Sequence, residues 1–93
     1  MQAAIHSDVH AHQILVRDVQ QVFHEKLSIR IDSVDADLFA GGILDSMSLV
    51  QLILELERHF DLELPMGELE ISSFRSVIAI ATLVGERKNP NEV

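Results

Sequence analysis

The spacing of apolar residues between Leu49 and Phe60 constrains the fold more than any other feature of this chain. Apolar residues recur here every three or four positions, which places them on one stripe of an α-helix and excludes the alternation of a half-buried strand. The stripe consists of Leu49, Leu52, Ile53, Leu56 and Phe60. Asp45 or Ser46 can begin this helix, and Pro65 lies beyond its end.

Two further segments have helical spacing. The first begins at Ser7 or Asp8 as its cap and ends at Leu27, and the last uses Ser76 as its cap and ends near Arg87. The apolar stripe of the first is Leu15, Val19, Val22, Phe23 and Leu27, and that of the last is Val77, Ile80, Ala81 and Val84. With a short helix or turn near residues 68–71, the pattern predicts an all-α fold of three principal helices and one short helix.

A long connection separates the first two expected helices. Apolar and polar residues alternate over residues 28–32, which is typical of a strand, but one strand without a partner is unstable. We therefore expect a loop, which apolar side chains attach to the core. Loops of this length in compact domains tend to be functional. Gly41 and Gly42 allow a tight or left-handed turn just before the second helix.

A second apolar line runs along the same helix beside the first stripe. It consists of Met47, Val50 and Leu54. Burial of the helix needs only one stripe, so this line is either a docking surface for partner proteins or is covered by the first helix or the loop. The spacing alone leaves both interpretations open.

Composition restricts the function classes. The 93 residues suffice for one domain over residues 1–93, with flexible segments expected at 1–12 and 89–93. No apolar run reaches the roughly 20 residues that span a bilayer, and the N-terminus lacks the features of a secretory signal. We therefore expect a cytoplasmic protein without a membrane span.

The charged and metal-ligating residues exclude further classes. A net charge of −8 disfavours nucleic acid as a partner, and a chain without cysteine supplies no thiol of its own. His6, His10 and His12 lack a cysteine or well-placed carboxylate to complete a tetrahedral metal site, so we expect no metal. No nucleophile elbow or oxyanion hole is evident, so the sequence predicts no catalytic residues and no enzyme.

Ser46 is the residue whose role is least explained by the fold. A serine at the start of a helix is most often a cap, but the preceding Asp45 is itself a good cap and leaves Ser46 available. A phosphate ester on Ser46 would lie against the free N–H groups and the positive dipole end of the helix.

The stretch DLFAGGILDSMSLVQLILELERHF, residues 37–60, resembles the phosphopantetheine attachment region of acyl and peptidyl carrier proteins. Within that superfamily it looks most like the D-alanyl carriers and related stand-alone aminoacyl carriers. The resemblance rests on one pattern: an acidic residue, a serine and then a Leu or Met at a helix start that follows a glycine. Weaker similarity of helix order extends from about Ile14 to Lys88.

The resemblance implies a four-helix carrier fold in which Ser46 receives 4′-phosphopantetheine from coenzyme A, with Asp45 assisting the modification. The arm would hold an acyl group as a thioester. The implied partners are a phosphopantetheinyl transferase, an adenylation enzyme or ligase that loads the acyl or aminoacyl group, and a downstream acyltransferase, all acting on a monomer. The implied partner interface consists of Met47, Val50, Gln51, Leu54, Glu55 and Arg58.

Departures from the pattern bear on the cargo. Ser48 and Gln51 stand where carriers of fatty acid synthesis have acids, which favours an amino acid over a fatty-acyl or polyketide cargo. The alternative function, from a different class, is an unmodified helical adaptor in which Ser46 is only a cap.

Overall fold

The computed structural model describes residues 2–88, without the side chains of residues 2–11 and Met66. Its elements are α1 (Gln2–Leu27), α2 (Ser46–Phe60), the 3-10 helices η1 (Met66–Glu68) and η2 (Ile71–Phe74), and α3 (Val77–Lys88). No strand occurs within residues 2–88, so the all-α fold class and the loop between the first two helices are confirmed.

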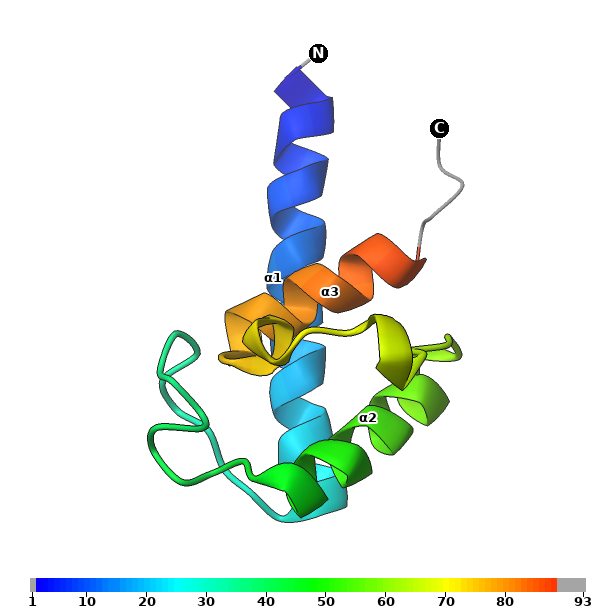
Figure 1. Cartoon of the computed structure of the whole chain (residues 1–93). Coiled ribbons are helices and arrows are strands. Elements are labelled where there is room, and N and C mark those ends of the chain that lie inside the picture. Colours follow the sequence, from blue (N-terminus) through cyan, green and yellow to red (C-terminus); the bar gives the residue numbers. More distant parts are fainter. Residues whose placement is uncertain (1, 89–93) are drawn as a thin grey trace.

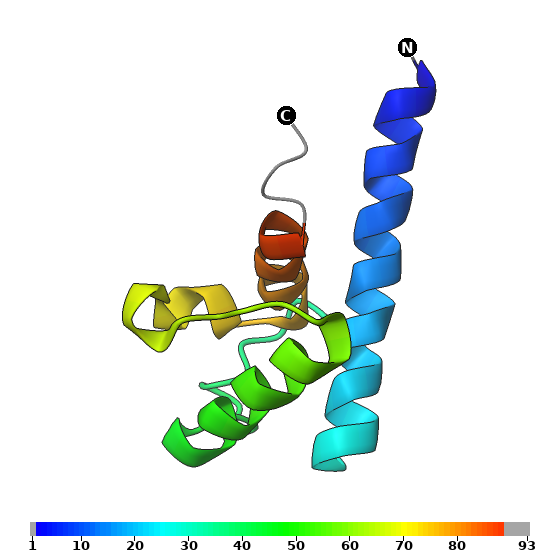
Figure 2. The ribbon, with the colours of Figure 1, turned by 90° about the vertical axis from the view of Figure 1, so that its right-hand side faces the viewer.

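The helices pack around α1 (Figure 1). α3 crosses α1, while α2 runs obliquely near the other end of α1, and the η1–η2 segment connects α2 to α3. Seen from the side, α1 forms one layer and the remaining elements form the other (Figure 2). The N-terminal turns of α1 extend beyond α3 in both views.

The core lies between these two layers. Its buried apolar residues are Val19, Val22, Phe23, Ile31, Leu38, Leu44, Leu52, Ile53, Leu56, Phe60, Leu64, Phe74, Val77, Ile80, Ala81, Leu83 and Val84. Burial of each side chain of leucine or phenylalanine size contributes about 1.5–3 kcal/mol, so this set accounts for the docking of all three helices. The predicted stripes are confirmed, with Leu15, Leu27 and Leu49 partly buried at the edge of the core.

The predicted start of the first helix is wrong. α1 begins at Gln2, so Ser7 and Asp8 lie inside the helix and do not cap it. Gln2, Ala3 and Ala4 have good helix propensity and no glycine or proline interrupts them, so nothing stops the helix at the expected cap. The expected flexible segment at 89–93 lies outside the described residues.

The short fourth helix differs in form from the expectation. The expected single element near residues 68–71 is replaced by two 3-10 turns, η1 and η2, on either side of Leu69. Short 3-10 pieces are common connectors. η2 buries Phe74 in the core and leaves Ile71 exposed.

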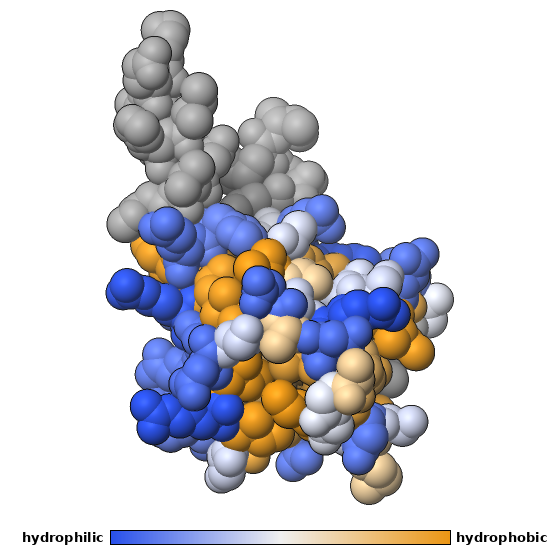
Figure 3. Space-filling view, turned by 90° about the vertical axis from the view of Figure 1, so that its left-hand side faces the viewer, coloured by the Kyte–Doolittle hydropathy of each residue, from blue (hydrophilic) through white to orange (hydrophobic). Residues whose placement is uncertain are grey.

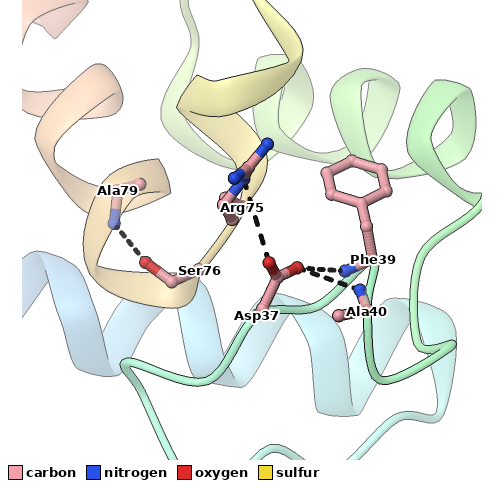
Figure 4. Close-up of polar contacts among 6 residues, drawn as sticks. All are labelled: Asp37, Phe39, Ala40, Arg75, Ser76 and Ala79. Atoms are coloured by element: carbon pink, nitrogen blue, oxygen red, sulfur yellow. Dashed lines mark hydrogen bonds and ion pairs between the residues drawn. The ribbon is translucent and has the colours of Figure 1, made fainter.

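The start of α3 and its packing on α1 each have a structural reason. As predicted, Ser76 caps the helix: its Oγ accepts the N–H of Ala79 at 3.1 Å (Figure 4). Gly85 does not end the helix, which continues to Lys88. A Cβ at Gly85 would lie 3.2 Å from Leu15 Cδ1, so this glycine permits the close packing of α3 on α1.

None of the described helices is both long and apolar enough to cross a membrane.

Candidate functional site

Asp45 caps α2. It has extended backbone angles, with φ −136° and ψ −171°, and its Oδ1 accepts the backbone N–H of Ser48 at 2.9 Å. In return, the Asp45 N–H donates to Ser48 Oγ at 2.8 Å. This capping box satisfies two backbone N–H groups that would otherwise lack partners, and it confirms the prediction that Asp45 takes the cap position.

The cap also shifts the acidity of Asp45. The hydrogen bond from the Ser48 backbone, reinforced by the Ser48 hydroxyl, lowers the pKa of the Asp45 carboxyl below the ordinary value of 3.8. Asp45 is fully exposed, so burial opposes this shift only weakly. The carboxylate is therefore ionised at neutral pH and is a weaker base than a free aspartate.

Ser46, the first residue of α2, is exposed. Because Asp45 and Ser48 complete the cap between them, the Ser46 hydroxyl is left without a hydrogen bond to any of the described residues. The first turn of α2 contains no acidic side chain, so only Asp45 contributes negative charge at this helix end. An exposed hydroxyl at the positive end of a helix dipole fits a covalently attached phosphodiester.

The turn before α2 presents this serine. Gly42 has φ +78°, a left-handed conformation that favours glycine, as the sequence predicts for this glycine pair. Leu38 and Leu44 are buried on either side of the turn. The turn between Leu38 and Leu44 is therefore attached to the core at both ends, while Asp45 and Ser46 remain at the surface.

The second apolar line of α2 is exposed. The relative exposure of Met47 is 82%, that of Val50 is 41% and that of Leu54 is 48%. The interpretation that α1 or the loop covers this line is therefore wrong, and the docking surface stays a prediction. Among the polar neighbours, Gln51 is exposed and Glu55 pairs with Arg58 across 3.8 Å. All six predicted interface residues thus lie on α2, downstream of Ser46.

Sequence reasoning missed Ile71, an exposed apolar residue near α2. Ile71 on η2 is 61% exposed and lines a cleft of about 140 Å³ together with Leu49, Ile53 and Phe74. The cleft joins η2 to α2, whose outward line is also apolar. A four-residue 3-10 helix shows no periodicity, so the sequence carries no signal that marks Ile71 as part of this surface.

A second concave region involves no residue of α2. Apolar side chains gather on the face formed by α1, the loop and the start of α3 (Figure 3). They line a groove of about 540 Å³ and include Ile14, Val16, Val34 and Ile78. Nearby, His12 Nε2 lies 3.2 Å from Thr82 Oγ1. Among the described side chains, no three possible metal ligands form a cluster. The side chains of His6 and His10 lie outside the described part of the chain.

Comparison with known proteins extends the similarity over most of the chain. The family described as "Phosphopantetheine attachment site" matches residues 17–81. A D-alanyl carrier protein of Streptococcus mutans is 36% identical over 75 residues, which cover 81% of this chain and 91% of the relative. A D-alanyl carrier protein of Lactococcus lactis is 43% identical over 60 residues, which cover 64% and 76% respectively. A third, from Streptococcus gordonii, is 39% identical over 75 residues, with 81% and 91% coverage.

Proposed function

The chain belongs to the family of proteins with a phosphopantetheine attachment site, and on this premise we propose that Ser46 carries 4′-phosphopantetheine and that the protein delivers D-alanine to an acceptor. The relatives at 36–43% identity are D-alanyl carrier proteins, which supports an amino acid as cargo. The arm, once attached, supplies the thiol that this cysteine-free chain lacks and holds the amino acid as a thioester.

One observation carries the assignment to Ser46. Its hydroxyl is exposed at the start of α2 while the neighbouring Asp45 forms the cap. In the modification, Ser46 Oγ attacks the β-phosphorus of coenzyme A and a P–O bond to serine forms. The phosphoanhydride bond breaks, adenosine 3′,5′-bisphosphate leaves, and the hydroxyl proton passes to a base.

The lowered pKa of Asp45 indicates how this residue assists. Its carboxylate is already stabilised by the Ser48 N–H and hydroxyl, so it is a poor acceptor for the Ser46 proton. We assign it instead a role through its charge: it holds the capped helix start and offers an anionic ligand to the magnesium ion that a transferase brings with coenzyme A. The proton acceptor is then a group of the transferase.

The exposed line of α2 supports a docking role. A phosphopantetheinyl transferase, a ligase that activates the amino acid and a downstream acyltransferase must each reach Ser46, and Met47, Val50 and Leu54 lie on the same helix. Gln51, Glu55 and Arg58 add polar contacts on the same helix, and exposed Ile71 lies at a cleft that Leu49 and Ile53 of α2 also line. Flexible Met47, nearest to Ser46, suits contacts with several different partners.

Intact-protein mass spectrometry tests the proposal. The protein is incubated with coenzyme A, magnesium and a promiscuous phosphopantetheinyl transferase, and we expect one phosphopantetheine adduct. Ser46→Ala should gain none. Ser72→Ala is the control because it removes an exposed serine hydroxyl outside this capping box and should still be modified.

A second step tests the cargo. The modified protein is offered D-alanine, L-alanine and a medium-chain fatty acid, each with ATP and the corresponding activating ligase, and thioester formation is followed by mass. Preferential loading of D-alanine supports the proposed cargo. The absence of any adduct on folded wild-type protein with more than one transferase would instead favour the unmodified adaptor.

A further inference from the structure

Asp37 organises the turn that precedes the modified helix. Its Oδ1 accepts the backbone N–H of Phe39 at 3.0 Å and that of Ala40 at 2.9 Å (Figure 4). Its backbone carbonyl accepts the N–H of Gly41 at 3.0 Å. Three successive N–H groups are thus held by one residue, which closes the chain into a tight turn.

Leu38 transmits this turn to the start of α2. Its carbonyl accepts the N–H of Ile43 at 2.9 Å and that of Leu44 at 3.0 Å, and its side chain is fully buried. Leu44, also buried, is followed directly by the cap Asp45 and then by Ser46. The position of the helix start therefore depends on a turn that Asp37 closes.

The same turn is attached to the junction between η2 and α3. The Leu38 N–H donates to the carbonyl of Arg75 at 2.7 Å, and the Asp37 Oδ2 lies 3.9 Å from Arg75 Nε (Figure 4). Both charged side chains are substantially exposed, so the ion pair contributes little by itself. The hydrogen bonds to Asp37 Oδ1 and to the Leu38 backbone are the stronger connections.

From these contacts we infer that Asp37 is a positioning residue for the modification of Ser46, an inference that rests on the proposed function. By closing the turn over residues 37–44, it keeps Ser46 in the arrangement that a transferase recognises. Loss of the Asp37 oxygen lowers the population of this arrangement. The apparent affinity of the transferase for the carrier falls with the population of this arrangement. The loss should therefore raise KM and leave kcat unchanged.

Transferase kinetics on three variants test this inference. Asp37→Ala removes the acceptor, and we expect KM for the carrier to rise about fivefold or more with kcat within about twofold of wild type. Asp37→Asn keeps an oxygen for the Phe39 and Ala40 N–H groups and should stay within about twofold in both constants. Asp35→Ala is the matched control: it removes a carboxylate of the same loop that, among the described residues, accepts a hydrogen bond only from the Ser33 hydroxyl.

Hydrogen–deuterium exchange provides a readout that does not depend on modification. In Asp37→Ala the Ile43 and Leu44 amides should exchange about tenfold faster, while the Ile80 amide in α3 keeps its protection. If Asp37→Ala fails to fold, Asp37→Ser replaces it, because a serine hydroxyl makes the same turn bond more weakly. Its KM should lie above that of Asp37→Asn.

The outcomes separate the two claims. An unchanged KM and unchanged exchange in Asp37→Ala, or a fall confined to kcat, would overturn the positioning role. So would an Asp37→Asn variant as impaired as Asp37→Ala, because the charge rather than the accepted hydrogen bonds would then matter. A wild-type protein that takes no adduct would overturn the proposed function instead, while the exchange data would still report whether Asp37 holds the turn.

Discussion

At the start of α2, Asp45 caps the helix and the neighbouring Ser46 keeps its hydroxyl free of the cap. A serine at a helix start normally uses its hydroxyl to accept a backbone N–H. Here Asp45 accepts the Ser48 N–H and Ser48 returns a hydroxyl to the Asp45 N–H, so the helix end is satisfied without Ser46. The consequence is an exposed hydroxyl at the first residue of α2.

The cap makes a prediction about acid stability. The folded-state pKa of Asp45 is lowered, so its charge stabilises the fold fully above the unfolded value near 3.8, and this contribution is lost as pH falls through the folded pKa below 3.8. Asp45→Asn retains a cap oxygen but no charge. It should be less stable than wild type at neutral pH and equally stable in strong acid.

Urea denaturation at a series of pH values measures this difference. The gap in unfolding free energy between wild type and Asp45→Asn should be constant from neutral pH down to about pH 5 and should close in the acid limb. A gap that stays constant throughout the acid limb would show that the Asp45 charge does not stabilise the folded state.

At the scale of elements, α2 carries two apolar lines with different environments. One line includes Leu52, Ile53 and Leu56 and is buried against the other helices. The other is substantially exposed and begins one residue after Ser46. A helix that served only to complete the core would need the first line alone.

The two faces of α2 predict different costs for the same substitution. Leu56 is fully buried, so Leu56→Ala should destabilise the fold by about 2–5 kcal/mol. Leu54 lies one-half turn away and is half exposed, so Leu54→Ala should cost about 1 kcal/mol or less. Chemical denaturation of the two variants measures both values, and similar losses would contradict the division into a core face and a free face.

At the scale of the whole molecule, the packing directs one apolar surface outward. α1 packs against both α2 and α3, and within the described residues the outward line of α2 stays substantially exposed. The hydrogen bond from the Leu38 N–H to the Arg75 carbonyl connects the turn before α2 to the junction between η2 and α3. The start of α2 and η2 are therefore joined through this turn.

The outward line predicts a defect in partner recognition without a defect in folding. Met47→Asp places a charge on a side chain that is almost fully exposed, so circular dichroism and thermal unfolding should match wild type. Transferase modification or ligase loading should lose about tenfold or more in kcat/KM, because the apolar contact is replaced by a charge that must be desolvated.

Ile14→Asp provides the control for this prediction. It introduces the same charge at an exposed apolar residue of α1. This residue lines the groove of about 540 Å³, to which α2 contributes no residue. Its kinetics should equal those of wild type. An equal loss in both variants would assign the effect of Met47→Asp to net charge, and an unfolded Met47→Asp would place Met47 in the core.

Local patterns were enough to predict most elements, since helix stripes and caps depend on residues that are close in sequence. The bounds of α2, the Ser76 cap and the buried faces follow from spacing and capping residues alone. The prediction for the start of α1 was wrong because Ser7 is a typical cap residue, but the residues before it also favour a helix, so the helix begins at Gln2. A short turn or helix was predicted near residues 68–71, but its division into η1 and η2 was not, because segments of three or four residues have no measurable period.

The sequence by itself determined the fold class, the capped start of α2 and the resemblance that points to Ser46, because all three depend on residues adjacent in the chain. Only the tertiary structure decided whether Met47, Val50 and Leu54 are covered, since helical spacing defines a face but not its neighbour. It also brought Asp37 to Arg75 and Gly85 against Leu15. These contacts join residues far apart in sequence, and only packing of the helices around one core sets such distances.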